Sequence, residues 1–401
     1  MLDAYIYDGL RTPIGRHAGA LAGVRPDDMV AGLIRALVAR NPVSPSEIED
    51  VLLGCACQAG EDGRNIGRHA GLLAGLPVGT AGATINRLCG SGMNAVIDAC
   101  RAASLGEGEL FVAGGVESMT RAPLVMAKAE TAYSREIKVF DTTIGARFAN
   151  PLLVAEHGNH SMPETADNVA DDLGIGREES DRFAWMSQQK YARAKAAGFF
   201  DGEILPVEVP SRNRKAPPTV VAEDEHPRPE TTLEQLAKLK PLAEGGVVTA
   251  GNSSGINDGA AALLIGSRRI GLANGMKPLA RVRAAAIAGV PPRIMGLGPV
   301  PASRKALERA GLTLADMDVI EINEAFAVQV LGCCRELDLD PEDPRLNPNG
   351  GAVALGHPLG ASGARLMLTA ARQMRRQGGR FALATMCIGV GQGIAAVLEA
   401  V

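Results

Sequence analysis

The feature that most constrains the fold is an internal repeat. The string LCGSG at residues 88–92 aligns with LGASG at 359–363 after a shift of 271 residues, without a gap. The same shift places the apolar run that follows the first string on the run after the second, and LFVA at 110–113 on FALA at 381–384. Chance similarity of short glycine and alanine strings is the weaker explanation, since the order of the aligned segments is kept. The chain is therefore predicted to contain two related halves.

Each half alternates apolar strand patterns with amphipathic helical patterns, which indicates an α/β fold. The predicted strands cover 4–7, 50–54, 83–85, 110–115, 259–265, 279–287, 318–322 and 381–386. The predicted helices cover 27–37, 65–75, 92–105, 302–310 and 363–377.

The middle of the chain departs from this alternation. From 121 to about 246 it is richer in charge and proline and shows one convincing helix, at 178–197. Residues 212–229 are polar and proline-rich and are expected to be exposed. A long insertion on an α/β scaffold is either a binding or assembly segment or a surface embellishment. We predict a first half of 1–120 plus 251–275, an inserted loop domain of 121–250, and a second half of 276–401.

Composition excludes several classes of function. A net charge of −4 without a basic stripe argues against nucleic acid as a partner, and no apolar run is long enough to span a bilayer. The seven cysteines are odd in number and lack the paired spacing of zinc sites, so no metal is expected. No secretory leader is recognisable, and reduced thiols in the cytoplasm are the simplest interpretation.

Four chemically capable side chains lie in loops that the repeat would bring together. If a pseudo-twofold axis relates the halves, the turns of Cys89 and His357 and the loops of Asn323 and Cys387 converge. Cys89 precedes a predicted helix, whose free N–H groups and partial positive charge favour a thiolate. A lone cysteine is more often a small buried hydrophobe, but the accompanying histidine, amide and second thiol favour a reactive group.

These residues resemble the thiolase family. Three motifs carry the resemblance: NRLCGSG at 86–92, NEAF at 323–326 with GHP at 356–358, and CIGVGQG at 387–393. They occur in the order and spacing of that family over nearly the whole chain. The resemblance implies two similar α/β halves in a five-layer α-β-α-β-α sandwich, with a loop domain inserted in the first half.

The resemblance also implies a ping-pong acyl transfer. Cys89 would be the nucleophile that carries the acyl group as a thioester, activated by His357. Cys387 would be the general acid and base. Asn323, through a held water, and His357 would form one oxyanion site, and the N–H groups of Cys89 and Gly389 the other.

By the same resemblance, coenzyme A would be a substrate, and no cofactor is expected. Arg228 matches the arginine on the adenine and phosphate side, and Ser254 matches the serine that contacts pantetheine. Met162 and Phe326 are expected to line the acyl end. The pantetheine-side histidine is assigned to His157, although His160 and Ser161 lie in the same stretch.

Three further stretches, at 58–65, 141–148 and 162–168, resemble thiolases that act on 3-oxoadipyl-CoA in the degradation of aromatic compounds. The products would be succinyl-CoA and acetyl-CoA. A dicarboxylic acyl chain needs a donor for its distal carboxylate, and Arg64, Arg121 and Arg147 in or near these stretches are the candidates. Gly90 is a departure, because many relatives carry alanine there.

Several alternatives remain open at this point. An acetoacetyl-CoA thiolase or a broad-range 3-ketoacyl-CoA thiolase would share the same catalytic residues. A decarboxylating ketosynthase would be expected to carry a second histidine in place of Cys387. A non-catalytic acyl-CoA-binding protein of this fold would be expected to lack a cysteine or His357. The resemblance also implies a homo-oligomer, either a dimer or a homotetramer built as a dimer of dimers.

Overall fold

The two predicted halves form two similar parts of one mixed sheet. The computed structural model describes residues 2–211, 213 and 215–401. In the first half the strand order is β4-β3-β5-β10-β1, with β3 parallel to β4 and β5, and β10 antiparallel to both neighbours. These strands are β1 (Ala4–Arg11), β3 (Asp50–Gly54), β4 (Ala81–Ile85), β5 (Leu110–Ser118) and β10 (Asn257–Gly266).

The second half repeats this arrangement. Its order is β12-β13-β14-β11, with β12 parallel to β13 and β14 antiparallel to both neighbours. A parallel bridge between Ile320 and Leu346 lies where the first half has β4. The halves join where β1 pairs antiparallel with β11. The strands are β11 (Ala280–Gly289), β12 (Val319–Ile322), β13 (Phe381–Ile388) and β14 (Gln392–Glu399).

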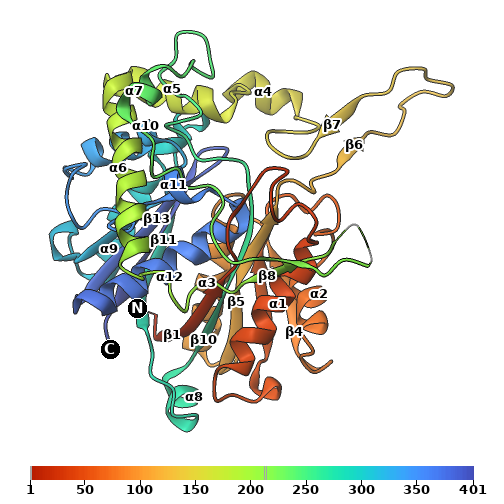
Figure 1. Cartoon of the computed structure of the whole chain (residues 1–401), viewed down its shortest axis with the longest axis vertical. Coiled ribbons are helices and arrows are strands. Elements are labelled where there is room, and N and C mark those ends of the chain that lie inside the picture. Colours follow the sequence, from red (N-terminus) through yellow and green to blue (C-terminus); the bar gives the residue numbers. More distant parts are fainter. Residues whose placement is uncertain (1, 212, 214) are drawn as a thin grey trace.

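Helices cover both faces of each half and complete the predicted five layers (Figure 1). Helices α1 and α2 pack on the outer face of the first half, α3 and α12 lie together in the middle, and α9 packs on the outer face of the second half with α10 beside it. Three buried apolar clusters fill the spaces between these layers. The helices are α1 (Pro26–Ala39), α2 (Ile66–Leu73), α3 (Ser91–Leu105), α9 (Pro299–Ala310), α10 (Ala327–Glu336) and α12 (Leu359–Gln377).

Glycines of the repeat allow the two central helices to touch through their backbones. A Cβ atom on Gly92 of α3 would lie 2.4 Å from the carbonyl oxygen of Gly360, and one on Gly363 of α12 would lie 2.4 Å from the Met93 nitrogen. Such distances leave no room for a side chain. Gly92 and Gly363 occupy the same position in the repeat, so each half contributes one glycine to the crossing.

The inserted segment contains more helix than the sequence predicted. The expectation of a single helix was wrong: α4, α5 and α7 accompany the predicted α6. The start of α5 carries a capping box between Ser161 and Glu164, and its apolar residues recur at helical spacing, at 162, 166, 169, 170 and 173. The sequence therefore contained a signal for this helix. The segment contains β6 (Leu124–Met126), β7 (Val139–Asp141), α4 (Pro151–His157), α5 (Met162–Leu173), α6 (Arg177–Ala196), β8 (Val207–Val209), β9 (Thr219–Val221) and α7 (Leu233–Ala237).

Short elements complete the described chain. They are β2 (Gly15–Arg16), η1 (Pro45–Glu47), α8 (Arg268–Ala273), η2 (Pro292–Leu297), η3 (Leu314–Asp316) and α11 (Ala352–Leu355). None of the helices in the described part of the chain combines the length and apolar character that crossing a membrane requires.

The stretch 212–229 is only partly exposed, contrary to expectation. Arg212 and Arg214 lie outside the described residues. Asp224, however, accepts two hydrogen bonds from the buried guanidinium of Arg11, at 2.7 and 3.0 Å, and Arg11 also pairs with Glu203 at 2.5 Å. Polar composition predicted exposure because the sequence does not reveal that a buried cation lies opposite this carboxylate.

The glycine crossing leads to a first prediction. Gly363→Ala should destabilise the protein by about 1–3 kcal/mol, because its methyl group would overlap the backbone of α3. The measurement is the midpoint of urea unfolding. The matched control is Gly32→Ala in α1, where a Cβ atom meets nothing within 4 Å and where alanine should stabilise the helix by about 0.5–1 kcal/mol. Equal midpoints for the two variants would contradict the role of the crossing.

Candidate active site

Cys89 lies in a tight turn between β4 and α3. Leu88 adopts a left-handed backbone conformation with φ of 46°, which is strained for a branched side chain. The Ser91 hydroxyl donates to the Leu88 carbonyl at 2.5 Å and accepts from the Arg87 N–H at 2.9 Å. Helix α3 begins at Ser91 with Gly90 as its N-cap. These bonds hold Cys89 at the end of the turn, just outside the helix.

The surroundings of Cys89 favour a neutral thiol in the free protein. Burial raises the pKa of Cys89, whereas hydrogen bonding from the N–H groups of Gly389 and of Cys89 itself acts in the opposite direction. The N–H groups at this turn do favour the thiolate, as expected, but burial outweighs them. The Gly389 N–H does lie against Cys89, so the loop after β13 meets the turn before α3.

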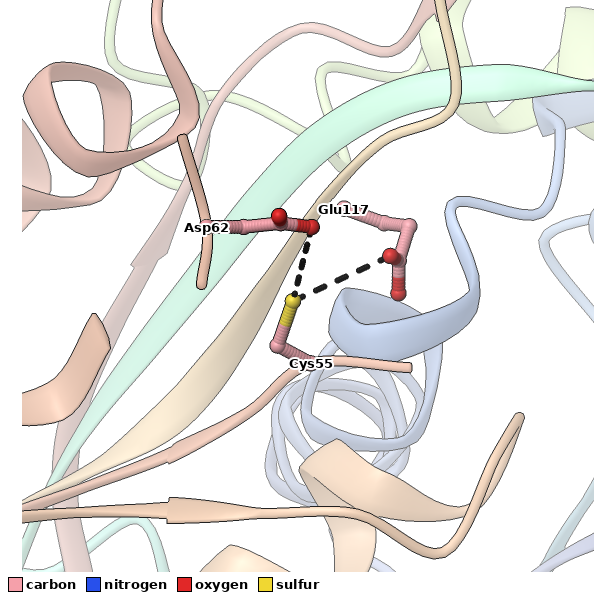
Figure 2. Close-up of side chains that lie close together, drawn as sticks. All are labelled: Cys55, Asp62 and Glu117. Atoms are coloured by element: carbon pink, nitrogen blue, oxygen red, sulfur yellow. Dashed lines mark hydrogen bonds between the residues drawn. The ribbon is translucent and has the colours of Figure 1, made fainter. Parts of the chain in front are cut away.

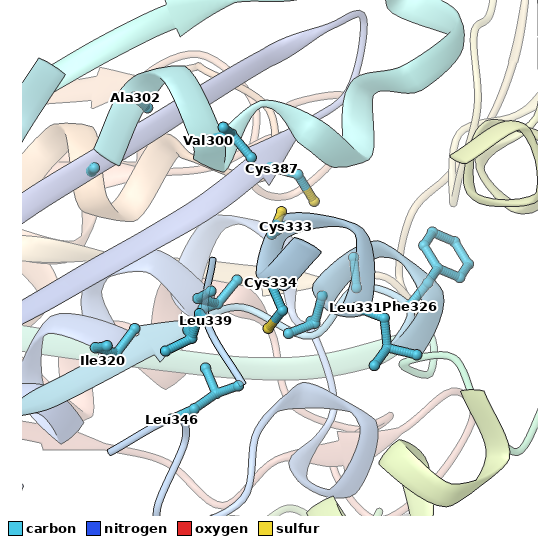
Figure 3. Packing of buried hydrophobic residues seen from close by; sticks show 14 of the residues in the cluster. Val300, Ala302, Ile320, Phe326, Leu331, Cys333, Cys334, Leu339, Leu346 and Cys387 are labelled. Carbon is cyan, nitrogen blue, oxygen red and sulfur yellow. The ribbon is translucent and has the colours of Figure 1, made fainter. Parts of the chain in front are cut away.

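Cys387 lies at the end of β13, close to Cys89. Burial raises the pKa of Cys387 well above its usual value, and the neighbouring Cys89 and Cys333 raise it further. Figure 3 shows Cys387 beside Cys333 of α10 in the apolar cluster of the second half. The structure thus brings two neutral thiols, Cys89 and Cys387, to one place from the two halves.

His357 is held with the lone pair of its imidazole on Nε2. Its Nδ1 atom lies 2.6 Å from the Ser362 hydroxyl, and that hydroxyl donates to the Pro358 carbonyl at 2.9 Å. A hydroxyl has one proton to donate, so it must accept from Nδ1–H. The lone pair of the neutral imidazole is therefore on Nε2.

The environment of His357 keeps its imidazole neutral. Burial lowers the pKa of His357 to about 3, and the positive charge of Arg365, one helical turn after Ser362, contributes to the lowering. A neutral imidazole can accept the proton of a thiol when a substrate is attacked. The turn of His357 leads into α12, whose first residues touch the start of α3 directly after the Cys89 turn.

Asn323 faces the same nitrogen of His357. Its Nδ2 atom lies 3.5 Å from His357 Nε2, and its backbone N–H bonds to the carbonyl of Thr385, two residues before Cys387. The Asn323 side chain is buried, and its Oδ1 atom has no hydrogen-bond partner within the described residues. Such a buried acceptor fits a small polar guest such as a water molecule.

Of the predicted substrate-contacting residues, Met162 borders this cluster, and Phe326 and Ser254 lie beside the loop that follows Asn323. A Cβ atom on Gly389 would lie 4.0 Å from the sulfur of Met162. Phe326 forms an isolated bridge with Ser253, and its ring extends away from the paired sulfurs in Figure 3. Ser254 donates to the carbonyl of Ala325, two residues after Asn323, at 3.0 Å.

Arg228 and His157 are the predicted residues that the structure does not bring to the cluster. Both are exposed, and within the described residues neither hydrogen-bonds to the groups around Cys89. His157 ends α4 beside Glu156. Their assignment to coenzyme A remains a prediction.

Three residues that the sequence motifs did not indicate hold the cluster together. They are Ser362, which orients His357; Asn257, which accepts the His357 N–H at 2.9 Å; and Glu117, which accepts the Gly360 N–H at 2.8 Å. The repeat contained a signal for the first, because Ser362 matches Ser91, which closes the equivalent turn. Asn257 and Glu117 act through hydrogen bonds to backbone groups that are distant in the sequence, and no local motif indicates such bonds.

The model of the thiolase N-terminal domain matches residues 4–269, and that of the thiolase C-terminal domain matches residues 276–400. Over the full length of both chains, this chain is 60% identical to a beta-ketoadipyl-CoA thiolase of Escherichia coli. It is 59% identical, again over both full lengths, to the 3-oxoadipyl-CoA/3-oxo-5,6-dehydrosuberyl-CoA thiolase of E. coli strain K12.

A solved structure is also closely similar. The acetyl-CoA acetyltransferase of Bacillus anthracis superposes with a TM-score of 0.93 at 38% identity, covering 100% of this chain and 99% of the other.

The orientation of His357 gives a second prediction. Ser362→Ala should slow alkylation of Cys89 by iodoacetamide at pH 7 by roughly 10- to 100-fold, because a hydrogen bond to the imidazolium that forms is worth about 1.5–3 kcal/mol. Peptide mass spectrometry at Cys89 measures the rate. Ser303→Ala, which removes another buried hydroxyl on α9, should leave the rate unchanged. An unchanged alkylation rate in the Ser362 variant would contradict the proposed role of the Ser362 hydroxyl in orienting His357.

Proposed function

The chain belongs to the thiolase family, and from that premise we propose that it cleaves 3-oxoadipyl-CoA with free coenzyme A to succinyl-CoA and acetyl-CoA. The observation that carries the substrate is the 60% identity, over both full lengths, to a beta-ketoadipyl-CoA thiolase. In that role the enzyme would serve the degradation of aromatic compounds. A second candidate substrate, acetoacetyl-CoA, is favoured by the similarity to an acetyl-CoA acetyltransferase, although at lower identity.

The first half-reaction breaks the bond between C2 and C3 of the substrate. The Cys89 thiol gives its proton to Nε2 of His357, and the sulfur attacks the C3 ketone. As the C2–C3 bond breaks, its electron pair leaves with acetyl-CoA as an enolate, which takes a proton at C2 from Cys387. The succinyl group remains on Cys89 as a thioester.

The second half-reaction returns the enzyme to its resting state. The thiol of free coenzyme A gives its proton to the Cys387 thiolate and attacks the thioester, and succinyl-CoA leaves as the His357 imidazolium returns its proton to the Cys89 sulfur. Two thiols are needed because Cys89 cannot act as an acid while it is acylated. The neutral states of Cys89, Cys387 and His357 support this scheme, since each proton moves between neighbouring groups.

Two oxyanion sites fit the same residues. The Gly389 N–H already lies against Cys89, where an oxygen on the attacked carbon would develop negative charge. Asn323 and His357 form the second site, with the buried Oδ1 atom of Asn323 able to hold the expected water.

The structure separates the three candidate arginines for the distal carboxylate. The Arg121 guanidinium is paired with Glu61 at 2.5 and 2.7 Å, so its charge is already compensated, and Arg64 is exposed. Arg147 is half-buried and donates to the carbonyl of Cys57 at 2.8 Å. Arg147 is the preferred candidate, because a backbone carbonyl leaves its positive charge uncompensated.

Exposed apolar residues support a homo-oligomer. The hairpin of β6 and β7 extends from the body of the molecule in Figure 1, and Leu124, Met126, Ile137 and Val139 are exposed along it. A concentrated apolar patch of this kind usually contacts another chain, and a second copy in a dimer or homotetramer is the proposed partner.

The seven cysteines are all free thiols, which supports the proposed cytoplasmic location.

Thiolysis measured with free coenzyme A tests the substrate. We expect kcat/KM for 3-oxoadipyl-CoA to exceed that for acetoacetyl-CoA tenfold or more, about 1.4 kcal/mol of transition-state discrimination. An equal or reversed preference would remove the substrate assignment and keep the mechanism. Cys89→Ala is the control for mechanism, because full activity in that variant would contradict acyl transfer through Cys89.

Replacing Arg147 tests the carboxylate contact. Arg147→Ala should raise KM for 3-oxoadipyl-CoA roughly tenfold, as expected for a lost charge-assisted hydrogen bond, and should spare acetoacetyl-CoA, which has no distal carboxylate. Arg121→Ala is the matched control and should affect both substrates alike. Equal losses on both substrates in the Arg147 variant would reject the contact.

A further inference from the structure

A buried carboxylate at the end of β5 has no part in the scheme above. Glu117 is 1% exposed and accepts three backbone hydrogen bonds. Its Oε2 atom accepts the N–H groups of Ala56 at 2.9 Å and of Gly360 at 2.8 Å, and its Oε1 atom accepts that of Cys57 at 3.0 Å. One side chain therefore binds two segments that come from different halves of the molecule.

Glu117 lies in a cluster with Cys55 and Asp62 (Figure 2). The ligand atoms of the three residues are within 4.8 Å of one another, a spacing that a metal ion could bridge. Each Asp62 oxygen, however, accepts a backbone hydrogen bond, from Gly60 at 2.9 Å and from Gln58 at 3.1 Å, and the Cys55 thiol donates to Asp62 at 3.4 Å. Because donors occupy both carboxylates, the cluster is better suited to fastening loops than to binding a cation.

The first of the two segments that Glu117 binds, residues 55–57, is linked by hydrogen bonds to the turn of Cys89. The Ala56 carbonyl accepts a hydrogen bond from the Asn86 side chain at 3.1 Å, and Asn86 in turn accepts the N–H of Leu88 at 2.9 Å. Leu88 is the strained residue directly before Cys89. The loop that Glu117 holds through Ala56 and Cys57 therefore supports the turn of the nucleophile.

The second segment that Glu117 binds, the start of α12, directly follows the turn of His357. Gly360 is the second residue of α12, three positions after His357. A Cβ atom on Gly360 would lie 2.9 Å from the Glu117 carboxylate and 2.5 Å from the carbonyl of Val116, so the start of this helix lies directly against the end of β5. Glu117 thus fixes the helix start from which the histidine turn departs.

We propose that Glu117 is a positioning residue that sets the placement of Cys89 relative to His357. It does so by holding the 55–57 loop and the start of α12 with one carboxylate. The inference rests on the proposed function to the extent that the thiol and the imidazole act together. A displacement of about 1 Å between reacting groups can cost about 100-fold in rate, so a residue that touches neither group can control the chemistry.

Both carboxyl oxygens of Glu117 act as hydrogen-bond acceptors in these contacts. Burial raises the pKa of Glu117 to about 7, while the N–H groups of Ala56 and Cys57 act in the opposite direction. An amide in its place would present N–H donors where the carboxylate accepts, so at least one of the two segments would be released.

The test compares Glu117→Gln with Asp62→Asn in the full-length protein. Asp62 belongs to the same cluster, but its hydrogen bonds stay within the 55–62 loop, so its replacement controls for loop stability. Two rates are measured: kcat and KM for thiolysis, and alkylation of Cys89 by iodoacetamide, which needs no substrate. Both rates are divided by the fraction of folded protein.

For Glu117→Gln we expect kcat and the alkylation rate each to fall roughly tenfold or more, with KM for coenzyme A changed less than twofold. Asp62→Asn should keep both rates within about twofold. Glu117→Asp, which retains the charge, should recover part of the loss and replaces the glutamine variant if that variant fails to fold.

Two results would overturn the proposal: unchanged rates in Glu117→Gln, or equal losses in Glu117→Gln and Asp62→Asn. If the wild-type protein cleaves neither candidate substrate, the proposed function fails. The alkylation comparison would then still decide the role of Glu117.

Discussion

The backbone contact between α3 and α12 is the constraint on which the rest of the structure depends. Because Gly92 and Gly363 carry no side chain, the two central helices approach until backbone atoms meet. The turns that precede both helices then lie together, and these turns carry Cys89 and His357. The repeat in the sequence thus has a physical meaning: each half contributes one glycine and one turn, and the site forms only when the halves pack.

Burial decides the resting chemistry of the site. It raises the pKa values of Cys89 and Cys387 and lowers that of His357, so all three groups are uncharged near pH 7. The arrangement differs from a preformed thiolate beside a helix end. Charge arises only when a substrate is attacked, and the Gly389 N–H, Asn323 and Ser362 are placed to stabilise it.

The inserted segment completes the molecule in two ways. It places Met162 against the Gly389 loop, and it returns Asp224 to the buried guanidinium of Arg11. The first contact brings the segment to the reacting groups, and the second fastens it to the first strand of the fold. A buried charge of this kind is costly without its partner, so the fastening depends on both residues.

The sequence by itself determined the two-halved α/β architecture and the identity of the reacting side chains, because periodicity, repeated glycines and the motifs around Cys89, His357 and Cys387 are local features. The prediction from the sequence omitted α5, although the apolar residues of this helix recur at helical spacing, and it assigned Asp224 to the surface. The ionisation states of the site and the contacts of Glu117 were decided only by the tertiary structure, because they depend on burial or on partners distant in the chain. Ser362 lies five residues after His357 and matches Ser91 in the repeat, but its contact with Nδ1 was decided by the conformation of that turn.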